Sequence, residues 1–185
     1  LSQIVAFGGG GFSMDAGNPL LDRYVLGLTG VERPRVCFVP TASGDADHYV
    51  VRFYRTFAAF GCEPSHLSLF RRDRTAATGD PGEHLLAQDL VYVGGGSVIS
   101  LLGTWRAHGI DAMLRGAWEA GVVMTGLSAG SLCWFEQGMT AFHGENAAVC
   151  GMGFLPHSNA VHYDDKPERR AAYLGEVQRS LDASI

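Results

Sequence analysis

Ser128 lies at the centre of residues 126–130, which read G-L-S-A-G. The apolar run 122–125 precedes this turn, and a segment with helical character begins at Ala129. A strand, a sharp turn of small residues and a helix are typical of a nucleophile elbow, which exposes the serine hydroxyl at the edge of a sheet. The first free N–H groups of the helix point toward the same place and can stabilise an oxyanion. The plainer interpretation is a small-residue turn that only packs a helix on a sheet.

A serine hydroxyl is a weak nucleophile unless a base accepts its proton. The chain has seven histidines, and two of them, His157 and His162, follow the elbow in the C-terminal part. A histidine downstream of the serine matches the chain order of serine hydrolases built on this architecture. The base is therefore expected in the C-terminal part.

The elements that must position these residues alternate along the chain. Apolar runs predict strands at residues 3–7, 35–40, 64–70, 90–93 and 122–125. Helical spacing predicts helices at residues 19–28, 49–60, 85–88, 97–105, 109–120 and 129–135. This order predicts an α/β fold, a doubly wound and mostly parallel sheet with helices on both faces. Active sites of such sheets lie beyond the carboxyl ends of the strands, where the glycine-rich turns 8–11, 94–96 and 126–130 fall.

Composition excludes several classes of protein. With 185 residues, 46% hydrophobic and 18% charged, residues 1–185 suit one domain with a sizeable core and exclude a disordered chain. A net charge of −5 argues against a nucleic-acid partner, and no apolar run approaches the roughly 18 residues that span a membrane. The four cysteines form no CxxC pair, so we expect a reducing, cytoplasmic compartment and no metal site.

The glycine run 8–11 has no acidic residue at the spacing that a dinucleotide site requires, so no cofactor is expected. The run instead predicts that the first loop approaches the active site closely.

Four motifs carry a specific resemblance, and they are spread over most of the chain. They are FGGGGFSMD at residues 7–15, VGGGS at 93–97, GLSAGSLCWFEQG at 126–138 and HYDDKPERRAAY at 162–173. In this combination and order the chain resembles the peptidase E family of serine peptidases, family S51, which includes aspartyl dipeptidases and cyanophycinases. It is most similar to the shorter members. The resemblance implies a class I glutamine amidotransferase-like fold.

The resemblance also implies roles for individual residues. Ser128 matches the nucleophile, and His162 matches the general base. Gly96 and Ala129 match the backbone donors of the oxyanion hole. Ser97 stands where the family usually has asparagine, so a polar contact there is expected to differ.

The acid that would orient the histidine is harder to assign. Aspartyl dipeptidases carry an aspartate some fifteen residues after the nucleophile, where this chain has His143. The candidates are Glu136, Glu145, Asp164 and Asp165. The motif favours Glu136, whereas the expected path of the chain back to the sheet edge favours Glu145. Our prediction takes Glu136.

The expected activity is serine peptidase hydrolysis of short peptides through a Ser-His-acid triad and an acyl-enzyme. Arg169 and Arg170 are predicted to face a substrate carboxylate, since guanidinium groups bind carboxylates in a bidentate manner. Because Ser97 and the acid position depart from the aspartyl dipeptidase pattern, we expect weak hydrolysis of Asp-X dipeptides. The alternative is a non-peptidase or ligand-binding relative on the same fold. A homodimer is one assembly that the sequence leaves open.

Gly96 leads to a further expectation. If its amide holds the oxyanion, replacement by a β-branched residue such as valine should reduce turnover far more than stability.

Overall fold

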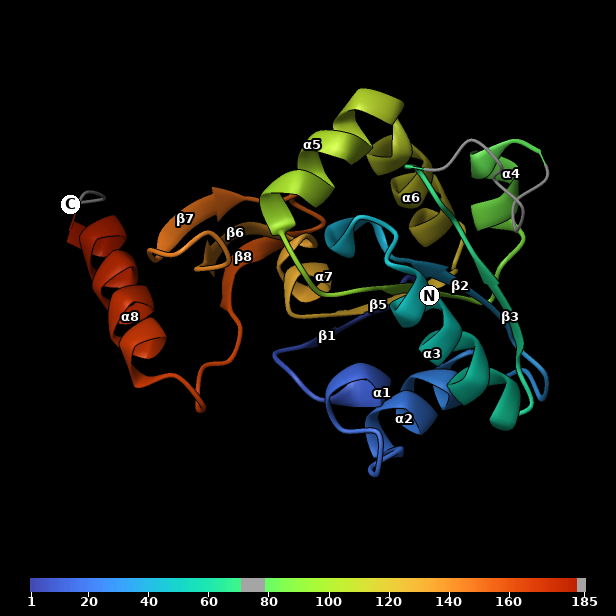
Figure 1. Ribbon diagram of the computed structural model, residues 1–185. Helices are drawn as coiled ribbons and strands as arrows, with labels where there is room; N and C mark the ends of the chain where they lie inside the picture. Colours follow the sequence, from blue (N-terminus) through green and yellow to red (C-terminus); the bar gives the residue numbers. More distant parts are fainter. Residues whose placement is uncertain (71–78, 183–185) are drawn as a thin grey trace.

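The computed structural model describes residues 1–70 and 79–182. Its central sheet has five parallel strands in the order β1-β5-β4-β2-β3 (Figure 1). The strands are β1 (Ile4–Phe7), β2 (Arg35–Val39), β3 (Glu63–His66), β4 (Leu90–Val93) and β5 (Val123–Leu127). All five predicted strands are confirmed. The third strand ends at His66 instead of reaching residue 70.

Helices cover both faces of this sheet (Figure 1). One face is covered by α1 (Gly11–Met14), α2 (Leu20–Leu28) and α3 (Asp47–Ala59). The other is covered by α4 (Pro81–Leu86), α5 (Val98–His108), α6 (Ile110–Glu119) and α7 (Ala129–Leu132). A 3-10 turn, η1 (Thr41–Ser43), follows β2. The doubly wound α/β fold that the sequence predicts is therefore confirmed.

The strands are buried on both sides, which explains their continuous apolar character. In β2, Val36 and Phe38 belong to the core beneath α1 to α3, whereas Cys37 and Val39 belong to the core beneath α5 and α6. Successive side chains of a strand point to opposite faces, so one apolar run supplies both cores.

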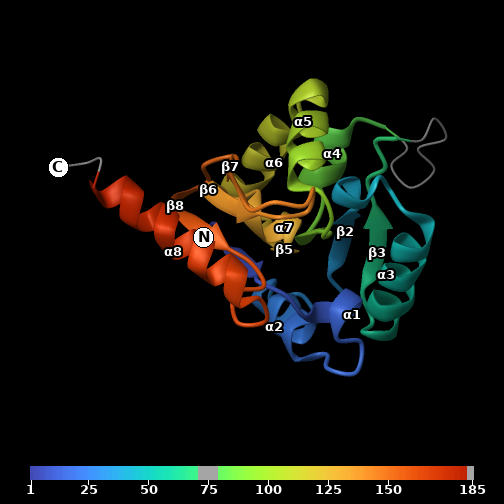
Figure 2. The same cartoon turned by 60° about the vertical axis from the view of Figure 1, so that its left-hand side comes forward.

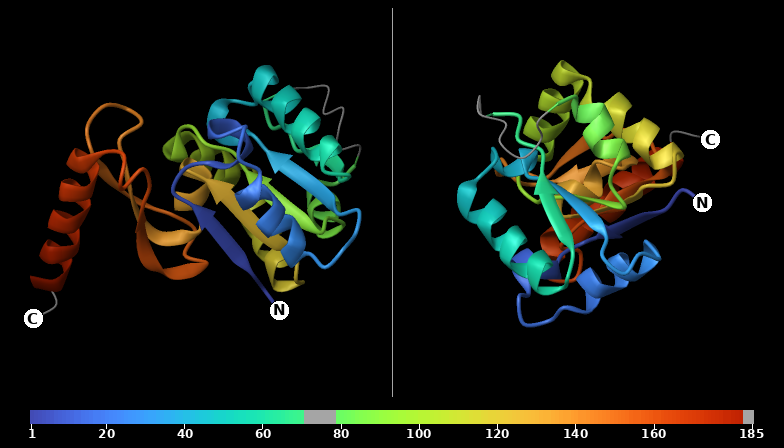
Figure 3. Two further views of the ribbon diagram at one scale, coloured as in Figure 1. Left: turned by 90° about the horizontal axis from the view of Figure 1, so that it is seen from below. Right: turned by 90° about the vertical axis from the view of Figure 1, so that its right-hand side faces the viewer.

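A smaller three-stranded sheet and a long helix form the C-terminal part. The strands β6 (Phe135–Thr140), β7 (Ala147–Cys150) and β8 (Leu155–Ala160) lie in the order β7-β6-β8, and α8 (Pro167–Asp182) follows. Figures 2 and 3 show this part to one side of the central sheet, with α8 outermost. The sequence did not predict these strands. The helix expected at residues 129–135 was too long, because the chain leaves α7 and enters β6 at Phe135. The interpretation of residues 1–185 as one domain stays a prediction.

Three further properties follow from the described residues. Cys37, Cys62 and Cys133 are buried free thiols, and Cys150 is exposed. No helix within residues 1–70 and 79–182 is long and apolar enough to cross a membrane. Nor does that part of the chain bring together three or more histidine, cysteine or acidic side chains in a way that would hold a metal ion.

Candidate active site

The elbow after β5 is shaped by its two glycines. A Cβ atom on Gly126 would overlap the carbonyl group of Gly130, and a Cβ atom on Gly130 would overlap the carbonyl group of Val93. Between them, Ser128 has φ 53° and ψ −113°, a combination that L residues rarely adopt. The turn therefore needs glycine on both sides, and it directs the Ser128 side chain out of the helix that follows.

His162 lies beside this serine. Its Nε2 atom is 3.1 Å from Ser128 Oγ, within hydrogen-bond distance. The first glycine loop holds the histidine in place, because the backbone N–H of His162 donates to the Gly8 carbonyl at 3.0 Å. The ring also packs on Gly9, where an added Cβ would lie 3.5 Å from Nδ1. The predicted close approach of the first loop to the active site is thus confirmed, and its reason is contact with the histidine.

The turn after β4 leaves one amide available. The neighbouring amides are engaged, because Gly95 donates to the Tyr49 hydroxyl at 3.2 Å and Ser97 donates to the Ala42 carbonyl at 2.8 Å. In the described part of the chain, the N–H of Gly96 has no protein acceptor. An unpartnered amide at this point is what an oxyanion donor requires.

The second predicted donor lies close by. Ala129 is the first residue of α7, where a backbone N–H has no acceptor within the helix. Gly95 is in contact with the elbow, since a Cβ placed on it would lie 3.4 Å from Ser128 Cβ. Gly96, Ser128 and Ala129 all line one cavity of about 290 Å³. The structure therefore brings these predicted site residues together.

No carboxylate in the described part of the chain is hydrogen-bonded to His162. Glu136 lies on β6 with an exposed side chain, and it lines neither of the two cavities beside Ser128. Glu145 and Asp164 are also exposed, and neither affects the pKa of His162. Asp165 does affect this pKa, through its charge. The structure therefore does not bring Glu136 to the Ser128–His162 pair as expected, because its segment is part of β6, which pairs with β7 and β8.

The surroundings of His162 favour its neutral form. Burial lowers the pKa of the imidazole, and the positive charges of Arg169 and Lys166 lower it further. The negative charge of Asp165 opposes this shift. A neutral imidazole is the form that accepts a proton, so this environment favours the form of His162 that a general base requires.

This environment predicts that neutralising Lys166 and neutralising Asp165 move the acid limb of the pH profile in opposite directions. The neutral fraction of His162 falls as the pH drops through its lowered pKa, so the acid limb of kcat/KM should lie below about pH 6.5, where an ordinary histidine titrates. Lys166→Met removes a positive charge and should move the limb to higher pH. Asp165→Asn removes a negative charge and should move it to lower pH. Glu168→Gln, whose charge does not contribute to the shift, is the matched control.

The pH profiles should be measured at low salt and repeated at about 0.5 M salt, where screening should shrink both displacements. If the acid limbs of Lys166→Met and Asp165→Asn moved in the same direction, this account of the electrostatics would be contradicted.

Two cavities meet at Ser128 and His162. The first is lined further by Thr140, Phe142 and the cations Lys166 and Arg169. The second, of about 300 Å³, lies on the side of α1 and α3. It is lined by Ser13, Met14, His48, Tyr49, Arg52, Gly95, Gly96, Leu127, Ser128 and His162. A substrate bound with its reacting carbonyl at Ser128 therefore has room on both sides of the scissile bond.

The two predicted carboxylate-binding arginines lie in different environments. Arg169 is only 7% exposed, donates from Nη1 to the Val161 carbonyl at 3.3 Å and leaves Nε without a partner among the described residues. Arg170 is exposed, stacks on the Tyr163 ring at 5.0 Å and does not line either cavity. The structure places Arg169 in the site and leaves Arg170 outside its lining.

Sequence reasoning missed the contact between Ser97 and His143, whose Oγ and Nε2 atoms are 2.8 Å apart. It also missed Arg52 of the second cavity. A signal for the first contact was present, because Ser97 and His143 occupy the two positions at which the chain departs from the pattern it resembles. Nothing in the sequence indicated that the two departures touch.

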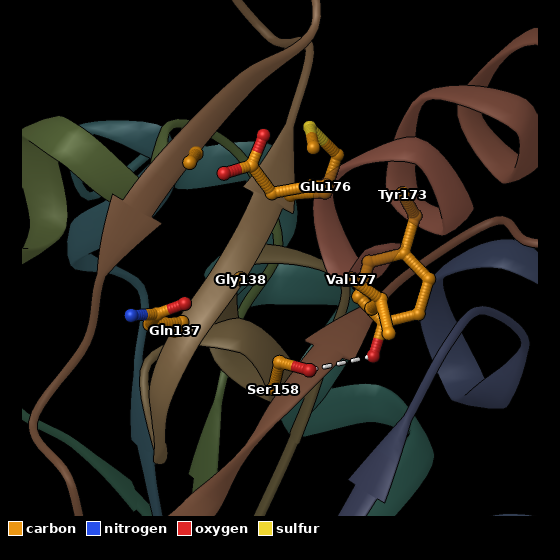
Figure 4. A pocket seen from close by; sticks show the side chains of 8 residues that line it. Gln137, Gly138, Ser158, Tyr173, Glu176 and Val177 are labelled. Atoms are coloured by element: carbon orange, nitrogen blue, oxygen red, sulfur yellow. Dashed lines mark hydrogen bonds between the residues drawn. The ribbon is translucent and has the colours of Figure 1, made fainter. Parts of the chain in front are cut away.

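A separate cavity lies between the small sheet and α8 (Figure 4). Glu176 and Val177 line it, and the Tyr173 hydroxyl is 2.8 Å from Ser158 Oγ across it. It shares no lining residue with the two cavities at Ser128. The chemistry of the elbow therefore does not extend into this cavity.

Known proteins resemble this chain over most of its length. A family model described as Peptidase family S51 matches residues 4–184. The chain is 46% identical over 173 residues to a Bacillus subtilis (strain 168) protein named uncharacterized peptidase YgaJ, and the match covers 94% of this chain and 74% of that protein. It also shares its fold with a solved peptidase from an acI-B1 Actinobacterium, with a TM-score of 0.71, 18% identity and coverage of 92% and 74% of the two chains. The chain therefore belongs to peptidase family S51.

Proposed function

We propose that this peptidase is a serine peptidase that hydrolyses short peptides through an acyl-enzyme. His162 accepts the proton of Ser128 while Oγ attacks the scissile carbonyl carbon. The carbonyl oxygen becomes an oxyanion, which the amides of Gly96 and Ala129 bind. His162 then donates the proton to the departing amine as the C–N bond breaks. Water, activated by the same histidine, hydrolyses the acyl-enzyme and restores Ser128.

The observation that carries this proposal is the 3.1 Å contact between His162 Nε2 and Ser128 Oγ at a strained elbow. A serine that only packed a helix on a sheet would need neither a strained backbone nor a histidine partner. No candidate carboxylate among the described residues is hydrogen-bonded to His162, and Asp165, whose side chain is exposed, is the one candidate whose charge raises the pKa of His162. Asp165 acts through its charge and not through a hydrogen bond.

A fluorophosphonate probe tests the proposal directly. Ser128 Oγ would displace fluoride from phosphorus and form a stable covalent adduct, while His162 takes up the serine proton. We expect mass spectrometry to locate one adduct on the peptide that contains Ser128, and none in Ser128→Ala. An unlabelled wild-type protein that is folded and pure would instead support the ligand-binding alternative on the same fold.

Arg169 suggests which substrates this site accepts. Arg169 as a residue is only 7% exposed, so its charge costs considerable desolvation unless an anion pairs with it, and no carboxylate of the described residues does so. Because Arg169 lines the same cavity as Ser128, a substrate carboxylate is a suitable partner. Since weak cleavage of Asp-X dipeptides is expected, we propose that the group bound is the C-terminal carboxylate of a short peptide.

Three substrates distinguish the sources of that carboxylate. Ala-Leu carries only the terminal group, Asp-Leu amide carries only the side-chain group, and Ala-Leu amide carries neither. We expect Ala-Leu to have the lowest KM, and Arg169→Met to raise this KM by about 10- to 100-fold, the value of a charge-assisted hydrogen bond. The control is Arg33→Met, which removes an exposed arginine that lies 3.4 Å from Glu63. Preference for Asp-Leu amide would show instead that Arg169 binds an acidic side chain of the substrate.

A further inference from the structure

Two segments that are far apart in the sequence meet beside the oxyanion turn. Ser97 directly follows Gly96 and precedes α5, whereas His143 lies in the loop between β6 and β7. Ser97 Oγ and His143 Nε2 are 2.8 Å apart. The contact therefore joins the small sheet to the turn that supplies the Gly96 amide.

Ser97 is held by several contacts at once. Its side chain is nearly completely buried, its amide donates to the Ala42 carbonyl at 2.8 Å, and its hydroxyl oxygen accepts the Ser100 amide at 3.2 Å. The last contact caps the N-terminus of α5. Because the oxygen already accepts one hydrogen bond there, the hydroxyl proton is available to donate to Nε2 of His143. The His143 imidazole is thus the hydrogen-bond acceptor of Ser97, the residue that follows the predicted oxyanion donor Gly96.

His143 directly follows three residues that form one wall of the active-site cavity. Thr140, Ala141 and Phe142, which immediately precede it, line the same cavity as Ser128 and Gly96. The Phe142 ring packs edge-on against the imidazole, with ring centroids 5.2 Å apart. Beyond His143 the loop is exposed as far as β7. The Ser97–His143 contact is therefore the polar attachment point of this wall.

We propose that His143 is a positioning residue, which through Ser97 fixes the Gly96 amide toward the oxyanion and holds residues 140–142 against the bound substrate. The proposal rests on the serine peptidase function proposed above. It predicts an effect on the acylation step, because the orientation of the Gly96 amide matters most when negative charge develops on the substrate oxygen. His143 itself does not touch the reacting atoms.

A double-mutant cycle tests the proposal. His143→Leu removes the hydrogen bond to Ser97 and replaces the imidazole with an apolar side chain of comparable size. Ser97→Ala removes the hydroxyl group on the other side of the same hydrogen bond. We expect each to lower kcat and the rate of fluorophosphonate labelling by about 10-fold or more, with a smaller change in KM. The double variant should be no slower than Ser97→Ala, because both single variants remove the same Ser97–His143 hydrogen bond and Ser97→Ala also removes the cap of α5. His143→Gln, whose terminal amide can reach Ser97, should recover most of the rate.

The matched control is Asn146→Ala, an exposed residue of the same loop, which should label at the wild-type rate. Thermal melts should show His143→Leu to be as folded as this control. Equal labelling rates for His143→Leu and Asn146→Ala, or losses that multiply in the double variant, would overturn the positioning role.

A third measurement separates this inference from the proposed function. Hydrogen exchange of residues 141–146 reports the attachment of the loop without any catalysis, and Ser97→Ala should accelerate it. Unchanged exchange would overturn the attachment even in an active enzyme. Conversely, faster exchange in a protein that neither labels nor hydrolyses peptides would retain the attachment, remove the positioning role in catalysis and refute the serine peptidase function.

Discussion

Replacing Ser128 with alanine should lower kcat/KM for a short peptide by about 10⁴-fold or more, the loss typical of removing the nucleophile from a serine-histidine pair. His162 Nε2, 3.1 Å from Ser128 Oγ in the native site, would have no hydroxyl to deprotonate. The remaining rate would come from the Gly96 and Ala129 amides and from substrate binding. Steady-state hydrolysis of Ala-Leu measures the effect.

Ser158→Ala is the control, because it removes a serine hydroxyl from the separate cavity near α8. Ser128→Gly adds a test of the strained backbone. Ser128→Gly should be as inactive as Ser128→Ala. It should nevertheless unfold at a higher temperature than Ser128→Ala, since glycine adopts φ 53° and ψ −113° with little strain. Activity of Ser128→Ala within ten-fold of the wild type would contradict the role of this serine.

The second large effect is expected at Gly96. A Cβ atom there would overlap the carbonyl group of Ala42, and the backbone has φ +142°, where side chains are strained. Gly96→Ala should therefore destabilise the fold by roughly 2–4 kcal/mol, the range of backbone strain and overpacking. In the molecules that remain folded, displacement of the amide should lower kcat by about 10²-fold or more. Urea denaturation and the fluorophosphonate labelling rate measure the two effects.

Gly103→Ala is the matched control, because a Cβ on this α5 residue meets nothing within 4 Å and alanine favours a helix. It should leave both stability and labelling at or above the wild-type values. The sequence led us to expect that Gly96→Val would reduce turnover far more than stability. The overlap of an added Cβ atom with the Ala42 carbonyl group, which the GGG run does not reveal, leads us to expect a loss of stability as well. Full stability of Gly96→Ala would refute this account.

Several features of the fold were predictable because they follow from local sequence. The five strands of the central sheet are short apolar runs, and burial of both faces requires that character. The elbow was predictable for a steric reason, since Gly126 and Gly130 lack a side chain at the points where backbone segments approach each other most closely. Chain order and the resemblance placed His162 near Ser128, and the structure has them in contact.

The small sheet was not predictable in this way. Its strands have mixed exposure, as in β8, where residues 156–158 are exposed and the other three are partly buried. They carry neither a continuous apolar run nor a clear alternation, so their pairing depends on residues distant in sequence. The prediction of Glu136 as the acid failed to gain support for this reason. It rested on the motif in which Glu136 stands, whereas the position of the side chain is decided by the pairing of β6.

The sequence by itself determined the sharp turn that carries Ser128, and with it the chemistry that we propose, because such a turn depends on residue types within five positions. Only the tertiary structure decided which distant groups surround it. It placed Arg169 in the cavity with no anionic partner among the described residues, Asp165 within electrostatic reach of His162, and His143 within hydrogen-bond distance of Ser97. The physical reason is that local sterics act between neighbours along the chain, whereas charge pairing and hydrogen bonding act between neighbours in space.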